Sequence, residues 1–315
     1  MDYRESDIGR RRSWYGAKKH LKRALGWRVP NALMRAVVRF APSIRGTGRL
    51  PAPAYVREVE GLVGDARFVM LRPDRCVVAK ELYWGKGRRP RAEDDFALQL
   101  FATLATKADV VFDIGAYTGI FTLAATSVNP ALEAHAFEIV PEVHAALRDN
   151  CARNGILPRV TLHQEGVGAP DGSVRVPTGV SDSALPDFFS TRLHFESGEL
   201  VRLVSLDSLA RDLRSGAQVL IKIDVEGTEN EVLRYGQGLL ASIGPDILCE
   251  VLDGVADAAE LQKLLSPHGY RCYLVRGTDL LAADGIAPNV RYRDWFFSRR
   301  TPELLRSAGI AIADN

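Results

Sequence analysis

Three carboxylates lie within six residues in the second half of the chain. Asp224, Glu226 and Glu229 directly follow the apolar run 219–223. Clustered carboxylates raise one another's pKa unless a cation, a metal or hydrogen-bond donors intervene, and this suits them to proton transfer. We therefore expect Asp224 or Glu226 to bind or deprotonate a substrate group, with Glu229 beside them. The alternative is a solvated acidic turn.

Two more charged residues belong with this acidic segment. Lys222 interrupts the apolar run, and we expect it to pair with one of the carboxylates. Glu250 ends the next apolar run, so parallel strands would bring it to the same edge of the sheet, as a substrate contact or as a partner for Lys222. Oxygen ligands suit a hard cation, so Asp224, Glu226 and Glu250 are also candidate ligands for Mg²⁺.

A small-residue turn predicts a nucleotide site earlier in the chain. Residues 109–119 pass from an apolar strand through Gly115, Ala116 and Gly119 into a helix. The glycines let the backbone approach a ligand, and the helix start offers unpaired N–H groups. The spacing is D-x-G-x-x-x-G, which lacks the pyrophosphate cradle of a typical NAD or FAD site.

Two acidic residues make this site more specific. Asp113 ends the strand facing the expected cleft, where a carboxylate opposes a phosphate but suits a cationic or amino-acid ligand. Glu138 ends the next strand, where it can accept hydrogen bonds from both ribose hydroxyls. A nucleoside with an amino-acid arm satisfies both, which describes S-adenosylmethionine. The alternative is that both residues only cap their strands.

An alternation of strands and helices must position these residues. Short apolar runs alternate with helical patterns, which indicates an α/β fold with a doubly wound, mostly parallel sheet. The expected strands are 110–114, 134–138, 160–163, 219–224, 247–251, 271–275 and 295–298, and the expected helices are 119–127, 143–154, 229–240 and 256–266.

In order and spacing these motifs resemble those of the FkbM-type methyltransferases. The matching segments are Asp113–Ala116, Phe137-Glu138, Leu206–Leu209, Ile221–Gly227 and Cys249-Glu250. The resemblance covers about residues 90–255. It implies the class I, Rossmann-like methyltransferase fold and methyl transfer from S-adenosylmethionine to a hydroxyl of a natural product or sugar. Tyr117 departs from the pattern, which often has Asn there, and residues 139–142 replace a proline that usually follows the acidic residue directly.

Other segments frame this core. We expect a basic amphipathic arm over 1–50, a small β and helical cap over 51–108, and a catalytic domain over 109–315. Residues 171–200 are too long and too aromatic for a plain connector and predict a lid or substrate insertion, with a disordered loop as the alternative. His194 lies in this segment and is the best alternative base.

The N-terminal cap, residues 51–108, is expected to begin with a hairpin layer. Residues 55–84 carry β-type residues, including Phe68-Val69-Met70 and Cys76-Val77-Val78. This layer forms the N-terminal helical and β extension of the fold. We expect it to precede the main sheet.

The net charge of +2 hides a strong gradient. Residues 1–49 hold 13 Lys and Arg against 3 Asp and Glu, whereas residues 50–315 hold 28 against 36. Basic residues interleaved with aromatics can lie on an anionic membrane surface. A helix packed on the acidic body, or a solvated tail, is the alternative, and no recognition motif supports nucleic acid as a partner.

Composition excludes several classes of protein. The four cysteines are scattered, so a disulfide framework or structural zinc site is not expected. No apolar run reaches the ~18 residues of a membrane span, and the start lacks a secretory signal, so a cytoplasmic location is predicted. An NAD(P)-dependent oxidoreductase and a non-catalytic membrane-docking module remain as alternatives. The expected partner is a small hydroxylated acceptor such as a sugar or glycolipid, and no oligomeric state is specified.

Overall fold

The computed structural model describes residues 31, 50–178, 195–211 and 213–313. Among them, no helix combines the length and the apolar character needed to span a bilayer. The predicted basic arm, apart from residues 31 and 50, lies outside the described residues. His194 and most of the predicted lid, residues 179–194, also lie outside them.

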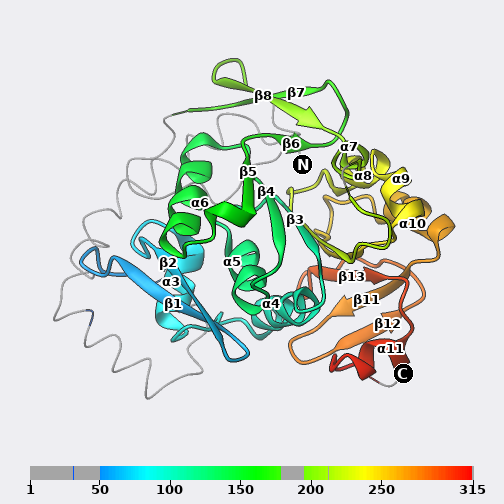
Figure 1. Cartoon of the computed structure of the whole chain (residues 1–315), viewed down its shortest axis with the longest axis horizontal. Helices are drawn as coiled ribbons and strands as arrows, with labels where there is room; N and C mark the ends of the chain where they lie inside the picture. Colours follow the sequence, from blue (N-terminus) through cyan, green and yellow to red (C-terminus); the bar gives the residue numbers. More distant parts are fainter. Residues whose placement is uncertain (1–30, 32–49, 179–194, 212, 314–315) are drawn as a thin grey trace.

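An eight-stranded sheet forms the centre of the molecule, in the order β12-β11-β13-β10-β9-β3-β4-β5 (Figure 1). Its strands are β3 (Val110–Ile114), β4 (Glu133–Phe137), β5 (Val160–His163), β9 (Val219–Ile223), β10 (Asp246–Glu250), β11 (Arg271–Val275), β12 (Leu280–Ala283) and β13 (Asp294–Ser298). The five strands β10, β9, β3, β4 and β5 are parallel to one another. β13 runs antiparallel to both of its neighbours, and β12 is antiparallel to β11. The doubly wound, mostly parallel α/β sheet is thus confirmed.

Every residue of β3, β9 and β10 is buried, because helices cover both faces of the sheet. One hydrophobic cluster joins the first face to the helices α3 (Val77–Trp84), α4 (Ala92–Ala105), α5 (Ile120–Val128) and α6 (Pro141–Arg153) and to α11 (Pro302–Ser307). A second cluster joins the other face to α7 (Leu206–Leu209), α8 (Glu229–Arg234), α9 (Gln237–Ser242) and α10 (Ala258–Leu265).

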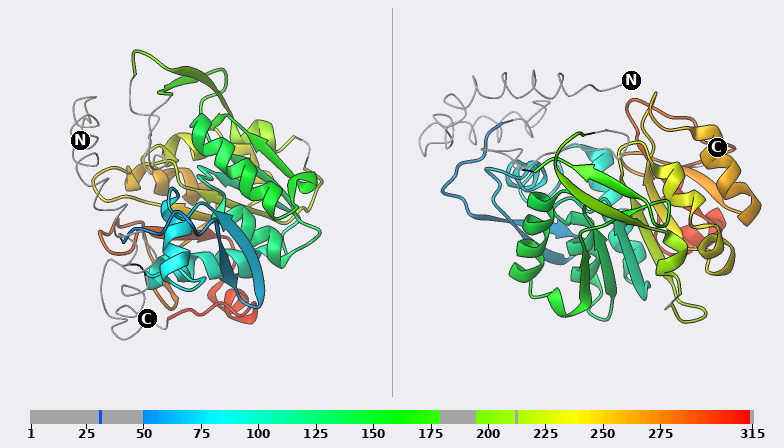
Figure 2. Two further views of the ribbon diagram at one scale, coloured as in Figure 1. Left: turned by 90° about the vertical axis from the view of Figure 1, so that its left-hand side faces the viewer. Right: turned by 90° about the horizontal axis from the view of Figure 1, so that it is seen from above.

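The N-terminal cap contains the predicted hairpin, β1 (Glu58–Val63) and β2 (Ala66–Leu71), which pair antiparallel. The hairpin packs beside α5 and α6, at the blue side of the molecule in Figure 2. The β-type reading of Cys76-Val77-Val78 is wrong, because α3 begins there. The Cys76 Sγ caps this helix by accepting from the Ala79 N–H at 3.4 Å.

The predicted helix 229–240 is two helices, α8 and α9, with a break at Gly236. A Cβ on Gly236 would lie 2.7 Å from Leu206 Cδ2, so this close approach requires glycine. Asp207 then caps the second helix, since its Oδ1 accepts from the Leu239 N–H at 2.8 Å. Tertiary contacts with α7 therefore divide the predicted helix.

The two ends of the predicted lid belong to a three-stranded sheet in the order β6-β8-β7, at the top of Figure 1. Its strands are β6 (Gly166–Val167), β7 (Ser173–Val176) and β8 (Glu199–Val204). Val174, Val176 and Val201 from this sheet pack against Val140 and Val143 at the start of α6. The base of the predicted lid is therefore fixed near the carboxyl end of β4.

Candidate active site

The turn from β3 to α5, residues 115–119, is called here the glycine turn. Three of its residues have left-handed backbone: Gly115 at φ +80°, Tyr117 at +51° and Gly119 at +90°. A Cβ on Gly115 would lie 1.9 Å from the Asp224 carbonyl oxygen, and one on Gly119 would lie 2.5 Å from Leu147 Cδ1. Packing within the protein already requires both glycines, and Ala116 lies buried between them.

Glu138 follows β4 and holds the glycine turn from one side. Its Oε2 accepts from the Tyr117 N–H at 3.0 Å, and its Oε1 accepts from the Val140 N–H at 2.8 Å. Burial raises the pKa of Glu138 to about 7, although these backbone N–H groups oppose the shift. The Ile139 N–H also hydrogen-bonds this side chain. An ionised carboxylate offers about four acceptor positions, so about one remains for a hydroxyl group of a ligand.

Asp113 lies beneath the turn, 1% exposed, and does not face outward as expected. Its Oδ2 accepts from the Thr122 N–H at 3.0 Å and from the Thr122 hydroxyl at 2.6 Å. Burial raises its pKa to about 6, while the Thr122 hydrogen bonds and Lys222 act against this shift. α5 starts directly after the turn, and a backbone N–H of its first turn donates to the Asp113 carboxylate. This hydrogen bond fixes the start of the helix.

Asp224, Glu226 and Glu250 form what we call the carboxylate cluster. Each offers an oxygen that lies within 4.8 Å of the others. Asp224 is fastened to the end of β3, because its N–H donates to the Ile114 carbonyl at 2.9 Å. The structure thus brings together three residues that the sequence placed at the ends of neighbouring strands.

Glu226 has the most unusual environment in the cluster. Its φ of +53° is rare for a residue other than glycine, and Gly227 continues the sharp turn at +104°. Burial and the neighbouring Asp224 raise the pKa of Glu226 to about 8, while Arg293 and Lys222 oppose the shift. A carboxylate with this pKa can exchange a proton near neutral pH.

Lys222 is 1% exposed and lies under the cluster. Its Nζ is 3.3 Å from Asp224 Oδ2 and 3.4 Å from Asp294 Oδ1, and it donates to the Ile223 carbonyl at 3.3 Å. Burial alone would lower the pKa of Lys222, but Asp224, Asp294 and Glu250 together raise it. The lysine therefore stays charged and pairs with a cluster carboxylate, as the strand pattern indicated.

Glu229 begins α8 and is fully buried. Its Oε1 accepts from the Gly227 N–H at 2.8 Å, whereas its Oε2 has no hydrogen-bond partner among the described residues. Burial raises the pKa of Glu229, and nearby Asp224 adds to this shift. Its contacts fix the turn that carries Glu226.

Sequence reasoning missed Arg293 and Asp294. Arg293 Nη1 lies 3.1 Å from Glu250 Oε1, and Asp294 shares Lys222 with Asp224. Both precede the apolar run 295–298, which was a visible signal. Because β13 runs antiparallel, its start lies at the edge where the parallel strands end, and the apolar pattern alone does not reveal that direction.

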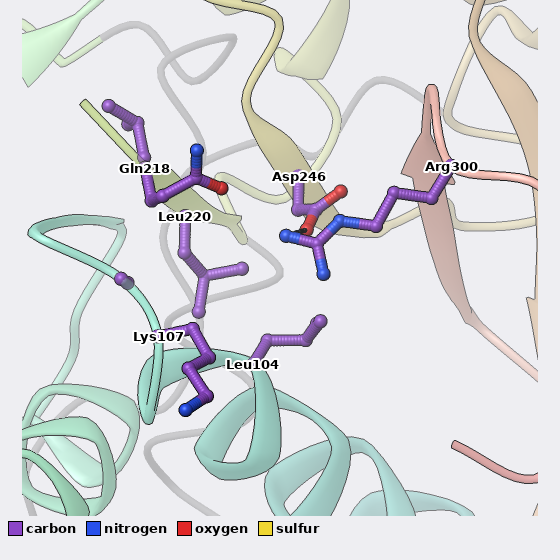
Figure 3. A pocket seen from close by; sticks show the side chains of 8 residues that line it. Leu104, Lys107, Gln218, Leu220, Asp246 and Arg300 are labelled. Carbon is purple, nitrogen blue, oxygen red and sulfur yellow. Dashed lines mark ion pairs between the residues drawn. The ribbon is translucent and has the colours of Figure 1, made fainter. Parts of the chain in front are cut away.

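Figure 3 shows a small pocket at the opposite edge of the sheet, lined by Leu104, Lys107, Ala108, Gln218, Val219, Leu220, Asp246 and Arg300. Its free volume of about 10 Å³ would hold one water molecule. A neighbouring cavity of about 120 Å³ shares Gln218, Asp246 and Arg300. Arg300 pairs with Asp246 at 2.9 Å. Ligands of such sheets bind at the carboxyl ends of the strands, so neither cavity belongs to the candidate site.

The chain is similar in sequence to known methyltransferases. The sequence model of the methyltransferase FkbM domain matches residues 113–272, just over half of the chain. The 31-O-demethyl-FK506 methyltransferase FkbM of Streptomyces tacrolimicus is 29% identical over 256 residues, which cover 71% of this chain and 88% of that protein.

Solved structures of methyltransferases are also similar. A methyltransferase FkbM from Methylobacillus flagellatus is 16% identical with a TM-score of 0.40, and the match covers 61% of this chain but only 44% of that one. A SAM-dependent O-methyltransferase from Thermotoga maritima is 9% identical with a TM-score of 0.35, covering 66% and 65%. By its match over residues 113–272, the chain belongs to the FkbM methyltransferase domain family.

Proposed function

We propose that this methyltransferase transfers a methyl group from S-adenosylmethionine to a hydroxyl oxygen of a small acceptor, such as a sugar, glycolipid or natural product. One observation carries the proposal. Gly115 in the glycine turn and the backbone of Asp224 are so close that a Cβ on Gly115 would lie 1.9 Å from the Asp224 oxygen. The proposed cofactor turn and the carboxylate cluster therefore form one continuous site.

The residues around the glycine turn suit this cofactor. When bound, S-adenosylmethionine supplies an electrophilic methyl carbon on a cationic sulfonium. Glu138 keeps about one acceptor position for a ribose hydroxyl, and Asp113 fixes the start of α5 below the turn. The nearby carboxylate cluster provides negative charge that favours a cationic ligand.

Glu226 is our choice for the base that accepts the proton of the acceptor hydroxyl. It is partly exposed, next to Asp224, and held in a strained turn of the kind that concentrates at functional sites. Lys222 and Arg293 offset part of the cluster's charge, since their nitrogens lie 3.3 Å from Asp224 and 3.1 Å from Glu250. General base catalysis of this kind contributes about 10²- to 10⁴-fold.

Calorimetry with S-adenosylhomocysteine tests the cofactor site. We expect micromolar binding by the wild type, loss of binding in Glu138→Ala, and no change in Glu133→Ala, which alters the opposite end of the same strand. Tighter binding of NAD(H) than of S-adenosylhomocysteine would instead support an oxidoreductase.

A panel of hydroxylated acceptors tests the base. Glu226→Gln should keep cofactor binding while methyl transfer falls by about 10²- to 10⁴-fold. If Glu226→Gln transfers methyl groups at the wild-type rate, Glu226 is not the base. If the wild type binds the cofactor but methylates nothing across a broad panel, a non-catalytic docking role is favoured.

A divalent cation is the second candidate for activating the acceptor hydroxyl, because the carboxylate cluster is an oxygen-only donor set of suitable size. Against it, Lys222 and Arg293 already lie 3.3 and 3.1 Å from two of the three carboxylates. Activity that survives EDTA supports the metal-free base. Activity that EDTA removes and Mg²⁺ restores supports the cation.

We further propose a cytoplasmic enzyme that contacts membranes through residues 1–49. The support is the excess of basic residues in this segment over an acidic body. A membrane-bound acceptor such as a glycolipid would then meet the enzyme at the surface.

A further inference from the structure

The side chain of Asn150 on α6 joins the glycine turn to the N-terminal cap. Its Nδ2 donates to the Thr118 carbonyl at 2.8 Å, and its Oδ1 accepts from the Leu71 N–H of β2 at 2.8 Å. Cys76 provides a second link, since its Sγ lies 3.1 Å from Thr118 Oγ1. Asn150, Thr118 and Cys76 are each at most 2% exposed, so water cannot easily replace these contacts.

The backbone that these contacts hold is strained. Tyr117, which precedes Thr118, has a φ of +51°, a conformation that bulky residues avoid. Such a conformation persists only when several surrounding contacts fix it. Glu138 fixes the N–H side of Tyr117, and Asn150 fixes the carbonyl of Thr118. The dipeptide Tyr117-Thr118 is thus held at both ends, at the Tyr117 N–H and at the Thr118 carbonyl.

We infer that Asn150 is a positioning residue for the glycine turn, and that the N-terminal cap sets the conformation of this turn through Asn150 and Cys76. Asn150 keeps Thr118 in place, Thr118 keeps the Tyr117 N–H on Glu138, and Glu138 faces the ligand. The role in cofactor binding rests on the proposed function. The role in holding the turn does not.

Asn154, one helical turn after Asn150, offers a matched control. Its Oδ1 accepts from the Val69 N–H at 2.8 Å, and its Nδ2 donates to the Val69 carbonyl at 2.7 Å. Asn154 therefore anchors the same hairpin to the same helix, and its side chain bonds Val69 and the Asn150 carbonyl rather than the glycine turn. Replacing either asparagine loosens the hairpin, but only the loss of Asn150 releases Thr118.

The experiment compares Asn150→Ala, Asn154→Ala and the full-length wild type by three measurements. These are the free energy of unfolding in urea, amide hydrogen exchange of the peptide spanning 115–119 without ligand, and the Kd of S-adenosylhomocysteine. Both variants should lose stability. Only Asn150→Ala should speed exchange in the turn, by about tenfold, and weaken binding by about fivefold to tenfold.

A second variant guards against misfolding of Asn150→Ala. Thr118→Val removes only the hydroxyl that contacts Cys76, at nearly constant volume, and should shift exchange and Kd in the same direction by about twofold to fivefold. The inference is overturned if Asn150→Ala and Asn154→Ala affect the turn equally, or if neither Asn150→Ala nor Thr118→Val changes its exchange. Faster exchange in Asn150→Ala, with no binding by the wild type, would uphold the positioning role and refute the proposed cofactor.

Discussion

At the scale of single residues, Lys222 explains how several carboxylates can lie together below the candidate site. It is the one lysine among the largest fully buried side chains of the described residues, and it faces both Asp224 and Asp294. Its Nζ also lies 5.2 Å from the centre of the Phe121 ring. A buried charge without a partner is far costlier than a buried pair, so these three residues depend on one another.

Lys222→Met should therefore destabilise the protein, by at most about 3–5 kcal/mol, because it leaves two partly buried carboxylates without their cation. Urea unfolding at pH 7 measures the loss. The triple variant Lys222→Met, Asp224→Asn and Asp294→Asn should recover much of the stability, since no unpaired charge remains. A free energy of unfolding for Lys222→Met within about 1 kcal/mol of the wild-type value would contradict this account.

The sequence predicted the positions of individual residues well where they end parallel strands. Asp224 and Glu250 follow apolar runs, and the rule for parallel sheets places both at one edge. The rule does not reveal which side chains form the hydrogen bonds that hold the turns at this edge. Asp113 contacts Thr122 because α5 begins beside it, and Asn150 reaches Thr118 across a sequence separation of 32 residues. Such contacts depend on packing that no local pattern encodes.

At the scale of elements, β4 and β5 carry a histidine pair beside Glu138, whose N–H donates to the His163 carbonyl at 3.0 Å. His135 Nδ1 lies 3.1 Å from His163 Nε2, and the His163 ring stacks on Phe137 at 4.2 Å. Burial lowers the pKa of His135, although Glu133 opposes the shift. Burial and His135 lower the pKa of His163, while Glu165 opposes this, and His144 adds to the lowering.

The pair predicts a loss of stability on acidification. Both folded-state pKa values lie below the ordinary 6.5, so the unfolded chain binds more protons once the pH falls below about 6.5. The contribution of the histidine pair to the free energy of unfolding is complete above about pH 6.5. It is lost progressively as the pH falls through the two folded-state pKa values. Urea unfolding between pH 8 and pH 5 should show a shallower acid loss in His163→Gln than in the wild type.

Other groups in the protein also titrate, so the comparison needs a matched variant. His135→Gln removes the other member of the pair and should also make the acid loss of stability shallower, because burial lowers the pKa of His135 as well. If the free energy of unfolding falls equally steeply with pH in all three proteins, the histidine pair does not contribute to the acid loss of stability. A steeper slope in His163→Gln would reverse the assigned sign.

Hydrophobic patterning predicted the strands of the sheet better than the helices that pack on them. The runs that became β3, β9 and β10 are continuously apolar because both faces are covered. Val77 and Val78 favour a strand by propensity, but the Cys76 cap and the buried face of α3 determine a helix instead. The long pattern over 229–240 likewise yields two helices, because Gly236 must approach Leu206. Tertiary contacts overrode local preference in both places.

At the scale of the whole molecule, the N-terminal cap and the sheet share one core. Phe68 and Met70 of β2 and Phe101 of α4 belong to the same hydrophobic cluster as Val111 of β3 and Ala124 of α5. Figure 2 shows the cap along one side of the sheet. The domain boundary expected near residue 108 therefore crosses continuous packing, and this agrees with a cap that helps to hold the glycine turn.

Charge is divided along the chain, with an excess of 10 positive charges in residues 1–49 and of 8 negative charges in the remainder. An anionic surface would attract the first segment and repel the body. Each Lys or Arg near such a surface contributes about 1 kcal/mol, and salt screens this attraction. The full-length protein should therefore float with vesicles containing phosphatidylserine at low salt, and bind less at 0.5 M NaCl.

Neutralising three neighbouring charges isolates this effect from the body. Arg10, Arg11 and Arg12 replaced together by Gln should weaken vesicle binding by about 100-fold, because about 3 kcal/mol of attraction is removed. Arg88, which pairs with Asp95 in the cap, gives the control Arg88→Gln, and binding should be unchanged.

Equal binding to neutral vesicles, or no loss in the triple variant, would exclude an electrostatic membrane contact. Stronger binding to RNA than to the vesicles at the same salt would assign the basic segment to nucleic acid. Methyl transfer to a soluble acceptor should be the same in the triple variant and the wild type, because all the candidate site residues in the described structure lie in the acidic body.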